Sequence, residues 1–292
     1  MNVSYNLPKI KGQYYFNFDI SNISYMKVGG ICDILYVPHD IHDLIHFLHN
    51  KPKNLPIYIV GNLSNTIVSD NGTRGCCISL KNLNNITLSE NFITVECGIT
   101  INNLVKYCIN NNISCCEQLY VVPGTIGGAL VMNAGVPSFE IKEVVESITL
   151  ININNCSTLI INNSNMKYRN GNLPKNYIAV SCKLKTQYKD SKELQLIVKN
   201  IIKKRMETQP INTNTCGSTF KNPPGQKAWQ LIKKSGCVGL GIGGAKVSEK
   251  HCNFIINDGT AKSSDIIQLI SLIQEKVFLK TGILLELEVK II

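Results

Sequence analysis

A long run without charge, from residue 118 to residue 139, constrains the fold of this chain more than any other feature. A membrane-spanning helix needs about 20 apolar residues in regular helix. Residues that disturb regular backbone interrupt this run: Pro123, Gly124, Gly127, Gly128, Gly135 and Pro137. Such punctuation is typical of irregular backbone packed inside protein. We therefore expect a buried, glycine-lined segment here and no passage through a membrane.

The N-terminal part alternates short β-rich runs with helical stretches. Residues 34–37 and 57–60 are expected to be buried strands, with a helix over residues 40–50 between them. A second amphipathic helix is expected over residues 101–110. Further strands are expected over residues 76–80, 86–88, 92–97, 148–153, 158–161 and 177–184. This alternation predicts a mixed α+β architecture.

The C-terminal third begins with a Lys-rich helix expected over residues 192–207 and ended by Gln209-Pro210. Helices over residues 228–234 and 264–279 and strands over residues 253–256 and 284–291 should follow. Ser263 or Ser264 is expected to cap the last helix at its start, and Gly282 to stop it. With 292 residues, 44% of them hydrophobic, the chain can form two domains, divided near this Lys-rich helix.

The formal net charge of +10 leaves two interpretations open. From residue 201 onward, 13 Lys and Arg face 7 Asp and Glu, so +6 of the charge lies in the last third. A site for an anionic small molecule such as a nucleotide-sugar diphosphate is one explanation, and a generally basic surface is the other. Nucleic-acid binding is disfavoured, because the basic residues are dispersed and no run of five occurs.

The cysteine pattern favours a reducing compartment. Of the 12 cysteines, adjacent pairs such as Cys76-Cys77 and Cys115-Cys116 suit neither a disulfide framework nor a zinc site. We expect free thiols, no metal site, and, because no signal peptide precedes the first strand, a cytoplasmic protein.

Two glycine-containing segments are candidates for a ligand site. Residues 60–70, VGNLSNTIVSD, follow a buried strand, where small residues let backbone N–H groups approach a phosphate. Residues 123–135, PGTIGGALVMNAG, lack side-chain bulk and could lie flat against a large planar group. An ordinary turn and closely packed strands are the respective alternatives. The first segment is not a G-x-G-x-x-G fingerprint and no Walker motif occurs in the chain, which disfavours a Rossmann or P-loop enzyme.

Together, the two segments resemble the FAD-binding domain of the UDP-N-acetylenolpyruvoylglucosamine reductase family, a PCMH-type fold shared with the vanillyl-alcohol oxidase group of flavoproteins. The resemblance continues in order through Lys167-Tyr168-Arg169, Arg205, Thr208-Gln209-Pro210 and residues 217–223, 243–248, 251–257 and 287–292. It implies an FAD-binding domain over residues 1–195 and a substrate-binding domain over residues 196–292. The short spacing between Arg169 and Tyr177 is similar to the shorter, second type of the family.

The resemblance implies an enzyme that uses NADPH and FAD to reduce UDP-N-acetylglucosamine enolpyruvate to UDP-N-acetylmuramate for peptidoglycan. No nucleic-acid or membrane partner is implied. The implied FAD-binding residues are Gly61, Asn62, Ser64, Asn65, Pro123, Gly124, Thr125, Gly127, Gly128, Asn133, Ala134 and Gly135. Leu63 departs from the family, which usually has Gly there. If that position needs positive φ, Leu63 is strained.

The resemblance also implies the residues that act on substrate. Arg169 would hold the substrate carboxylate, Ser218 would donate the proton, and Glu288 would stabilise the intermediate. Glu286 lies two residues earlier, so the choice of Glu288 rests on the family's ending. Implied substrate contacts are Tyr168, Arg205, Lys221, Asn222 and His251. The rival interpretations are another flavoenzyme of the same fold, such as an alcohol oxidase, and a basic nucleic-acid-binding module.

Overall fold

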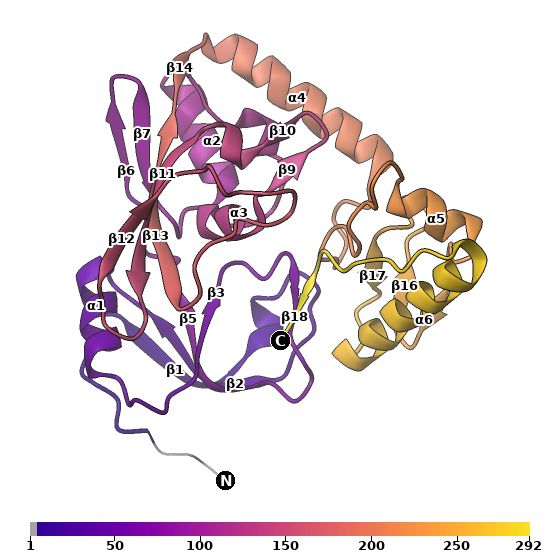
Figure 1. The fold of residues 1–292 in the computed structure, drawn as a ribbon, viewed down its shortest axis with the longest axis horizontal. Coiled ribbons are helices and arrows are strands. Elements are labelled where there is room, and N and C mark those ends of the chain that lie inside the picture. The colour runs from indigo at the N-terminus through magenta and orange to yellow at the C-terminus, as the bar shows by residue number, and fades with distance from the viewer. Residues whose placement is uncertain (1–4) are drawn as a thin grey trace. The chain divides into compact units, whose positions relative to one another are not determined.

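The computed structural model describes residues 5–292 and divides into two compact units (Figure 1). The first contains the chain up to Phe16 together with Ile34–Gly61 and Gly75–Ile202. The second contains Asn17–Asp33, Asn62–Arg74 and Lys203–Ile292. The second unit therefore takes two N-terminal segments besides the C-terminal third. The expected domain limits at residues 195 and 196 stay a prediction.

Two sheets form the frame of the first unit. One has the strand order β1-β2-β5-β3, and β3 pairs with β5 in parallel. The other has the order β12-β11-β13-β7-β6 with antiparallel pairing. Their bounds are Gln13–Asp19 (β1), Ile31–Val37 (β2), Ile57–Val60 (β3), Thr73–Ser79 (β5), Ile86–Ser89 (β6), Phe92–Glu96 (β7), Val145–Asn152 (β11), Thr158–Ile161 (β12) and Tyr177–Lys185 (β13). All the strands expected in this part are found, and β1 was missed.

The helices of the first unit pack their apolar faces on these sheets, in a core that includes Tyr36, Phe47, Leu104 and Leu150. The helices are α1 (Ile41–Asn50), α2 (Ile101–Asn110) and α3 (Ile126–Met132), and α4 (Ser191–Thr208) starts here. The short elements are the strands Ile113–Ser114 (β8), Gly135–Val136 (β9), Phe139–Glu140 (β10) and Gln187–Tyr188 (β14) and the 3-10 turns Ile20–Asn22, Glu117–Leu119 and Ile141–Glu143. Asp40 caps α1 by accepting a hydrogen bond from the Asp43 N–H, so the expected helix over residues 40–50 is confirmed.

The expectation of irregular backbone throughout residues 118–139 was wrong, because α3 lies inside this run. Thr125 caps the helix, with its Oγ1 3.3 Å from the Gly128 nitrogen. A Cβ on Gly127 would stand 3.2 Å from Cys97, so glycine here permits close packing. The helix was not predicted because two of its first three residues are glycines, although its other residues are apolar.

The second unit combines a small sheet with two helices. Its strands are β15 (Gly241–Ile242), β16 (Ala245–Val247) and β17 (Ile255–Asn257), all antiparallel, and β4 (Thr66–Ile67) pairs in parallel with β18 (Lys290–Ile291). The helices α5 (Ala228–Lys234) and α6 (Ser263–Thr281) pack on each other over a core that includes Phe220, Ile232, Leu269 and Val289. The strand expected over residues 284–291 is regular only at Lys290–Ile291, because the preceding residues bond to irregular segments.

Helix α6 is capped by a residue distant in sequence. The Asp70 carboxylate accepts hydrogen bonds from the backbone N–H groups of Ser263 and Ser264, at 2.7 and 3.0 Å. The expectation that Ser263 or Ser264 supplies the cap was therefore wrong. At the other end Gly282 has φ of 72° and stops the helix, as expected. Burial alone would raise the pKa of Asp70, but these backbone hydrogen bonds outweigh it and lower the pKa from its ordinary value.

Replacing Asp70 by Ala should lower the free energy of unfolding by about 1–2 kcal/mol, the usual value of a helix cap. Because the folded pKa is lowered, the carboxylate's charge stabilises the fold above the unfolded pKa, and this contribution is lost as pH falls through the folded pKa. Asp70→Asn keeps an acceptor without the charge. Urea unfolding should thus show a gap between native protein and Asp70→Asn that closes in acid. An equal gap at all pH values would contradict this.

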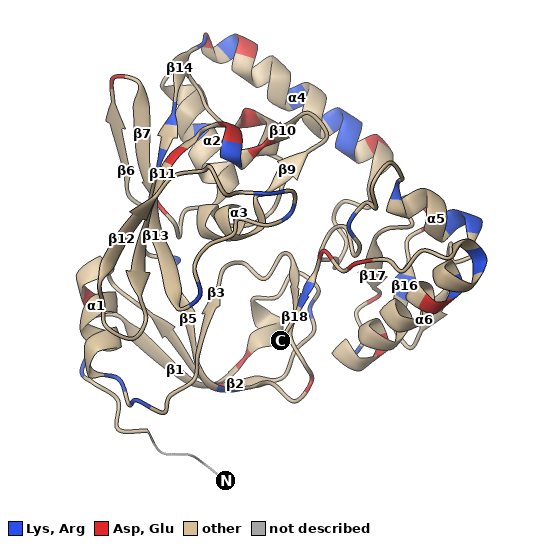
Figure 2. Cartoon of the chain, in the orientation of Figure 1, with Lys and Arg blue, Asp and Glu red and all other residues tan. Residues whose placement is uncertain are grey.

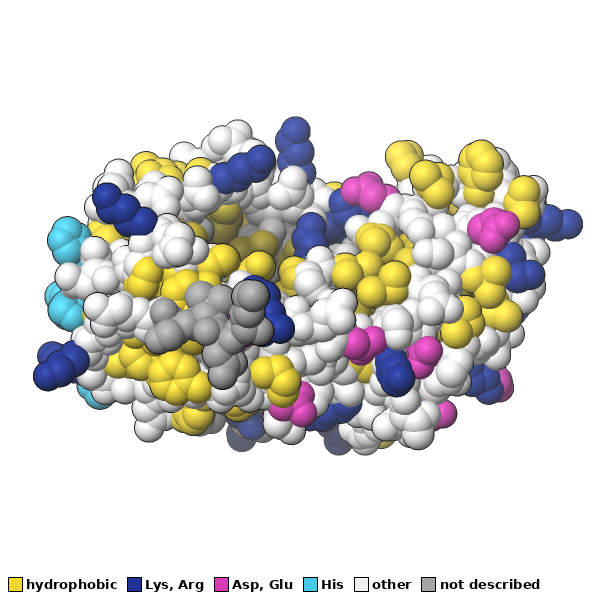
Figure 3. All heavy atoms as spheres, turned by 90° about the horizontal axis from the view of Figure 1, so that it is seen from below, with side chains coloured by type: hydrophobic (Ala, Val, Ile, Leu, Met, Phe, Trp, Pro, Cys, Tyr) yellow, Lys and Arg dark blue, Asp and Glu magenta, His cyan; other side chains and the backbone are white. Residues whose placement is uncertain are grey.

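Charged side chains are mixed over the surface that can be seen. Figure 2 shows several Lys and Arg along α4 and on α5, with acidic residues among them. On the face drawn in Figure 3, basic, acidic and apolar side chains are interspersed. No helix among the described residues is both long and apolar enough to cross a membrane. The twelve cysteines are free thiols, and all but Cys156 are buried.

Candidate active site

The start of the first glycine-containing segment lies beside the second segment within the first unit. Strand β3 ends at Val60, and a Cβ on the next residue, Gly61, would stand 2.9 Å from Oγ1 of Thr125, the cap of α3. Pro123 and Gly124 lead into that cap, and Gly124 has φ of 137°, a conformation that favours glycine. The fold thus brings together two of the implied cofactor segments, which lie about sixty residues apart in the chain.

The backbone N–H groups at the start of α3 are already bonded within the protein. Those of Ile126 and Gly127 donate to the carbonyls of Ile99 and Cys97, each at 2.9 Å. Gly128 is exposed, and around its missing Cβ only Oγ1 of Thr125 comes within 4 Å. The surface at Gly128 is therefore free of side-chain bulk, which fits the close approach of a large flat group such as a flavin.

Leu63 has a left-handed backbone conformation, so the strain expected for a position that needs positive φ is present here. Its φ is 50°, and the residue, which belongs to the second unit, is only 4% exposed. A side chain with a Cβ pays about 1–2 kcal/mol for this conformation. Burial of the leucyl group offsets that strain. Its neighbours Asn62, Ser64 and Asn65 are half-buried.

Leu63→Gly and Leu63→Ala should separate strain from burial. Both lose the leucyl contacts and should unfold more easily than native protein, by about 2 kcal/mol or more for Ala. Only Gly relieves the left-handed strain, so Leu63→Gly should be about 1 kcal/mol more stable than Leu63→Ala. Urea unfolding of the cofactor-free variants measures both values. If Ala proves the more stable of the two, Leu63 is not strained.

Ser218 and Glu288 lie on adjacent segments of the second unit. The Glu288 N–H donates to the Thr219 carbonyl at 2.9 Å, and the Thr219 N–H donates to the Asn253 carbonyl at 2.8 Å. Asn65 also contacts this segment, because its Nδ2 donates to the Glu288 carbonyl at 3.0 Å. The implied proton donor and the implied carboxylate, seventy residues apart in sequence, are thus held by neighbouring backbone. Both side chains are half-buried.

Asn253 is a buried residue that sequence reasoning did not single out. Its Oδ1 accepts from the Phe220 N–H at 3.1 Å, and its Nδ2 donates to the Phe220 carbonyl at 2.8 Å. The available signal was a polar residue at the start of the mostly apolar run over residues 253–256, where a strand was expected and where β17 begins only at Ile255. This carboxamide fixes the segment that carries Ser218.

The environment of Glu286 differs from that of Glu288, although the two alternate along the chain. Glu286 is 74% exposed in its side chain and forms an ion pair with Lys221. The Lys221 N–H also donates to the Glu286 carbonyl, at 2.8 Å. Oδ1 of Asn222 accepts from the Ala228 N–H at 3.0 Å and so caps α5. The implied substrate contacts Lys221 and Asn222 therefore also have structural partners.

Arg205 and His251 are the remaining implied contacts in the second unit. Arg205 lies on α4, half-buried, and burial lowers its pKa. The His251 ring packs edge-on against Phe254 with centroids 4.8 Å apart. Its Nδ1 is buried without a hydrogen-bond partner, and burial lowers the pKa of the ring. Among residues 5–292, no cluster of three or more His, Cys, Asp or Glu is arranged to hold a metal ion.

Tyr168 and Arg169 lie in the first unit on a tight turn. The Arg169 guanidinium is 5.1 Å from the Tyr168 ring centroid, and its Nη2 donates to the Gly135 carbonyl at 3.0 Å. Ala134 and Gly135 directly follow α3, and the Ala134 N–H donates to the Ala129 carbonyl at 2.8 Å. Arg169, Ala134 and Gly135 are therefore gathered at the C-terminal end of α3.

Comparisons with known proteins match two families to two different parts of the chain. The family described as FAD binding domain matches residues 32–159. The family described as UDP-N-acetylenolpyruvoylglucosamine reductase, C-terminal domain, matches residues 209–292. These matches and the mixed helices and sheets confirm the expected α+β fold with an FAD-binding domain followed by a distinct C-terminal domain. The chain is accordingly an FAD-dependent oxidoreductase.

Full-length relatives identify the particular enzyme family to which the chain belongs. A UDP-N-acetylenolpyruvoylglucosamine reductase of Rickettsia akari is 41% identical over 288 residues, covering 98% of each chain. That of Orientia tsutsugamushi is also 41% identical, covering 100% of this chain and 98% of its own. The crystal structure of the Thermus caldophilus enzyme superposes with a TM-score of 0.83 at 26% identity, over 97% of this chain and 99% of that one. The chain belongs to the UDP-N-acetylenolpyruvoylglucosamine reductase family.

Proposed function

We propose that the chain reduces UDP-N-acetylglucosamine enolpyruvate to UDP-N-acetylmuramate, a step of peptidoglycan synthesis, with NADPH as reductant. Family membership over nearly the whole chain supports the substrate class. The observation that carries the proposal is the pairing of the Ser218 and Glu288 segments through the Thr219 carbonyl. It supports a proton donor and a carboxylate acting on one small substrate.

FAD, when bound, supplies the redox chemistry by accepting hydride from NADPH and delivering it to the substrate. The residues we propose to contact it are Gly61, Asn62, Ser64, Asn65, Pro123, Gly124, Thr125, Gly127, Gly128, Asn133, Ala134 and Gly135. The close approach of Gly61 to Thr125 and the open surface at Gly128 support this set. The protein's own tasks are to hold the substrate, stabilise negative charge and deliver one proton.

Arg169 holds the substrate carboxylate, because a guanidinium offers paired donors and stays charged. As negative charge builds up on that carboxylate in an enolate-like intermediate, the Arg169 guanidinium stabilises it. The Ser218 hydroxyl then gives its proton to the carbon that bears the carboxylate. Glu288 stabilises the same intermediate by donating a hydrogen bond from its protonated form. Substrate contacts are completed by Tyr168, Arg205, Lys221, Asn222 and His251.

A steady-state assay tests the proposal as a whole. The purified protein should be yellow and should oxidise NADPH when the enolpyruvyl sugar nucleotide is added, with formation of a product two mass units heavier than that substrate. A small alcohol should not replace the enolpyruvyl substrate as a partner of the flavin. Colourless protein, or NADPH oxidation unaffected by that substrate, would contradict the proposed function.

FAD should be bound without a covalent link, because no His or Cys lies where the family fold would tether a flavin. Acid precipitation of fully loaded protein should release all of the FAD into the supernatant, identified by its absorbance and chromatographic retention. Flavin that stays with the precipitated protein would contradict non-covalent binding. Treatment of the pellet with protease provides the control for trapped cofactor.

A further inference from the structure

The turn that carries Arg169 is held in an unfavourable backbone conformation. Lys167 and Asn170 exchange backbone hydrogen bonds of 2.8 and 3.0 Å. Between them Arg169 has φ of 52°, in the left-handed region that residues with a long side chain seldom occupy. Such a conformation persists only when the surrounding structure imposes it, and it is found most often at functional sites. The contacts that impose it here can be identified.

Asn133 is the central one of these contacts. It is fully buried and ends α3 in the left-handed conformation, with φ of 43°. Its Nδ2 donates to the Lys167 carbonyl at 3.0 Å and to Oε2 of Glu140 at 2.9 Å. Its Oδ1 accepts from the Lys142 N–H at 3.2 Å. Both amide hydrogens are therefore used inside the protein, one of them on the turn of Arg169.

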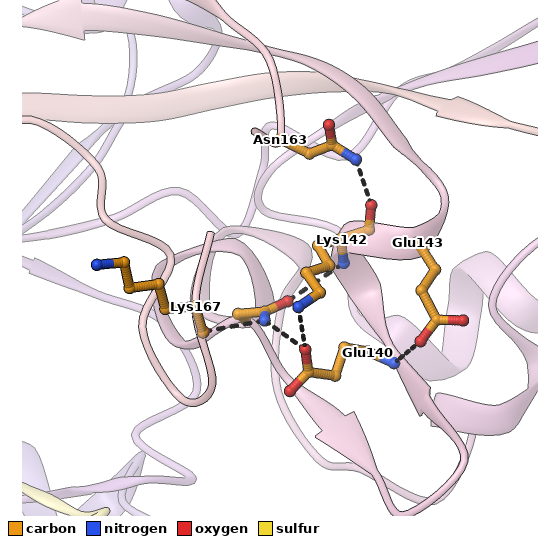
Figure 4. A network of polar contacts seen from close by, with 6 residues as sticks. Glu140, Lys142, Glu143, Asn163 and Lys167 are labelled. Carbon is orange, nitrogen blue, oxygen red and sulfur yellow. Dashed lines mark hydrogen bonds and ion pairs between the residues drawn. The ribbon is translucent and has the colours of Figure 1, made fainter. Parts of the chain in front are cut away.

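Further contacts fix the same turn on either side. The Gly171 N–H donates to the Val131 carbonyl at 2.8 Å, and a Cβ on Gly171 would stand 1.9 Å from the Leu130 carbonyl oxygen. On the other side, Nδ2 of Asn163 donates to the Lys142 carbonyl at 2.6 Å. Figure 4 shows Asn163 and Glu140 each linked to Lys142, whereas the Lys167 side chain points away and joins the network through its backbone carbonyl. The turn is thus fastened to the end of α3 and to the 3-10 turn that follows β10.

Arg169 itself completes the arrangement by reaching the backbone next to Asn133. Its Nη2 donates to the Gly135 carbonyl, two residues after Asn133. Oε2 of Glu140, which accepts from Asn133, also pairs with Nζ of Lys142 at 2.8 Å. The buried Asn133 side chain therefore bonds to the backbone of the turn that carries Arg169. The Arg169 guanidinium in turn bonds to the backbone of Gly135, two residues after Asn133.

We propose that the Asn133 side chain is a positioning residue for Arg169, and that it sets the direction in which the guanidinium meets the substrate carboxylate. This inference rests on the role given to Arg169 in the proposed function. It assigns the Asn133 carboxamide to the turn that carries Arg169. Displacing a binding group by about 1 Å can slow a reaction by roughly 100-fold.

Asn133→Gly is the informative variant, because glycine keeps the left-handed backbone while deleting the carboxamide. We expect reoxidation of the reduced flavin by the enolpyruvyl substrate to slow by roughly 10-fold to 100-fold. Substrate binding to the oxidised enzyme, followed by the change in flavin absorbance, should weaken in parallel. Because Asn133 is also among the proposed FAD contacts, the variant is measured fully loaded with FAD, and its rate of flavin reduction by NADPH serves as the internal reference for the rate of reoxidation.

A double-mutant cycle with Arg169→Ala separates positioning from general destabilisation. If Asn133 acts through Arg169, Asn133→Gly should have little further effect on either substrate binding or reoxidation once Arg169 is Ala. Multiplicative effects of the two changes would overturn the inference, as would a loss of FAD affinity with normal reoxidation. Should Arg169→Ala alone leave reoxidation unchanged, the proposed role of Arg169 fails, and the inference fails with it.

Glu140→Ala provides a second variant in case Asn133→Gly does not fold. It removes one acceptor of the Asn133 amide and leaves the bond to Lys167 in place. We expect a smaller slowing of the same reoxidation step, again absent in the Arg169→Ala background. A Glu140→Ala protein that folds, binds FAD and reoxidises at the native rate would overturn the inference.

Discussion

Ser218→Ala should slow reoxidation of the reduced flavin by the enolpyruvyl substrate by at least roughly 100-fold, the usual contribution of a positioned general acid. Reduction of the flavin by NADPH should be nearly normal, because the role proposed for Ser218 concerns only the substrate. The Ser218 segment is held by the Asn253 carboxamide and by the backbone of residues 253 and 288, so the variant should keep its fold.

Stopped-flow measurement of the two half-reactions tests this assignment. Ser271→Ala is a matched control in the same unit, since the Ser271 hydroxyl only donates to the Ile267 carbonyl within α6. That variant should be normal in both half-reactions. If Ser218→Ala slows both half-reactions equally, or slows neither, Ser218 is not the proton donor.

Glu288→Gln should impair the same half-reaction, by about 100-fold to 1,000-fold, the range for losing one preorganised donor at a developing negative charge. The amide is close in shape to a protonated carboxyl group but lacks its acidic proton. The backbone bonds of residue 288 to Thr219 and Asn65 do not involve the side chain and should persist. Flavin reduction by NADPH should again be close to normal.

Glu286→Gln is the natural comparison, because residue 286 lies two positions earlier and pairs with Lys221. It should alter the substrate concentration needed for half-maximal rate, with little change in reoxidation at saturating substrate. The opposite pattern, with Glu286→Gln slow and Glu288→Gln normal at saturation, would show that the catalytic carboxylate had been assigned to the wrong residue.

The elements with clear periodicity could be predicted from the sequence. Strand β3 and helices α2 and α5 have the expected bounds, because apolar residues at a period of two or 3.6 indicate which face is buried. Helix α3 could not be predicted, since Gly127 and Gly128 have low helix propensity. They are tolerated because Gly127 packs against Cys97. Tertiary packing overrode local preference at this point.

The candidate site was predicted only where a motif carries its residues. Gly61 and Thr125, and likewise Ser218 and Glu288, were named from separate motifs, and the fold brings each pair close. Roles that depend on distant partners were not accessible in the same way. Asp70 caps a helix almost two hundred residues later, and no local sequence pattern indicates that these two segments lie close together.

We propose that bound FAD passes electrons from NADPH to an enolpyruvyl sugar nucleotide. Anaerobic absorbance spectra of the purified protein test it most directly. Addition of one equivalent of NADPH should bleach the oxidised flavin band, and addition of UDP-N-acetylglucosamine enolpyruvate should then restore it with one equivalent of UDP-N-acetylmuramate formed. A protein without the flavin band, or a bleached flavin that this substrate fails to reoxidise, would contradict the account.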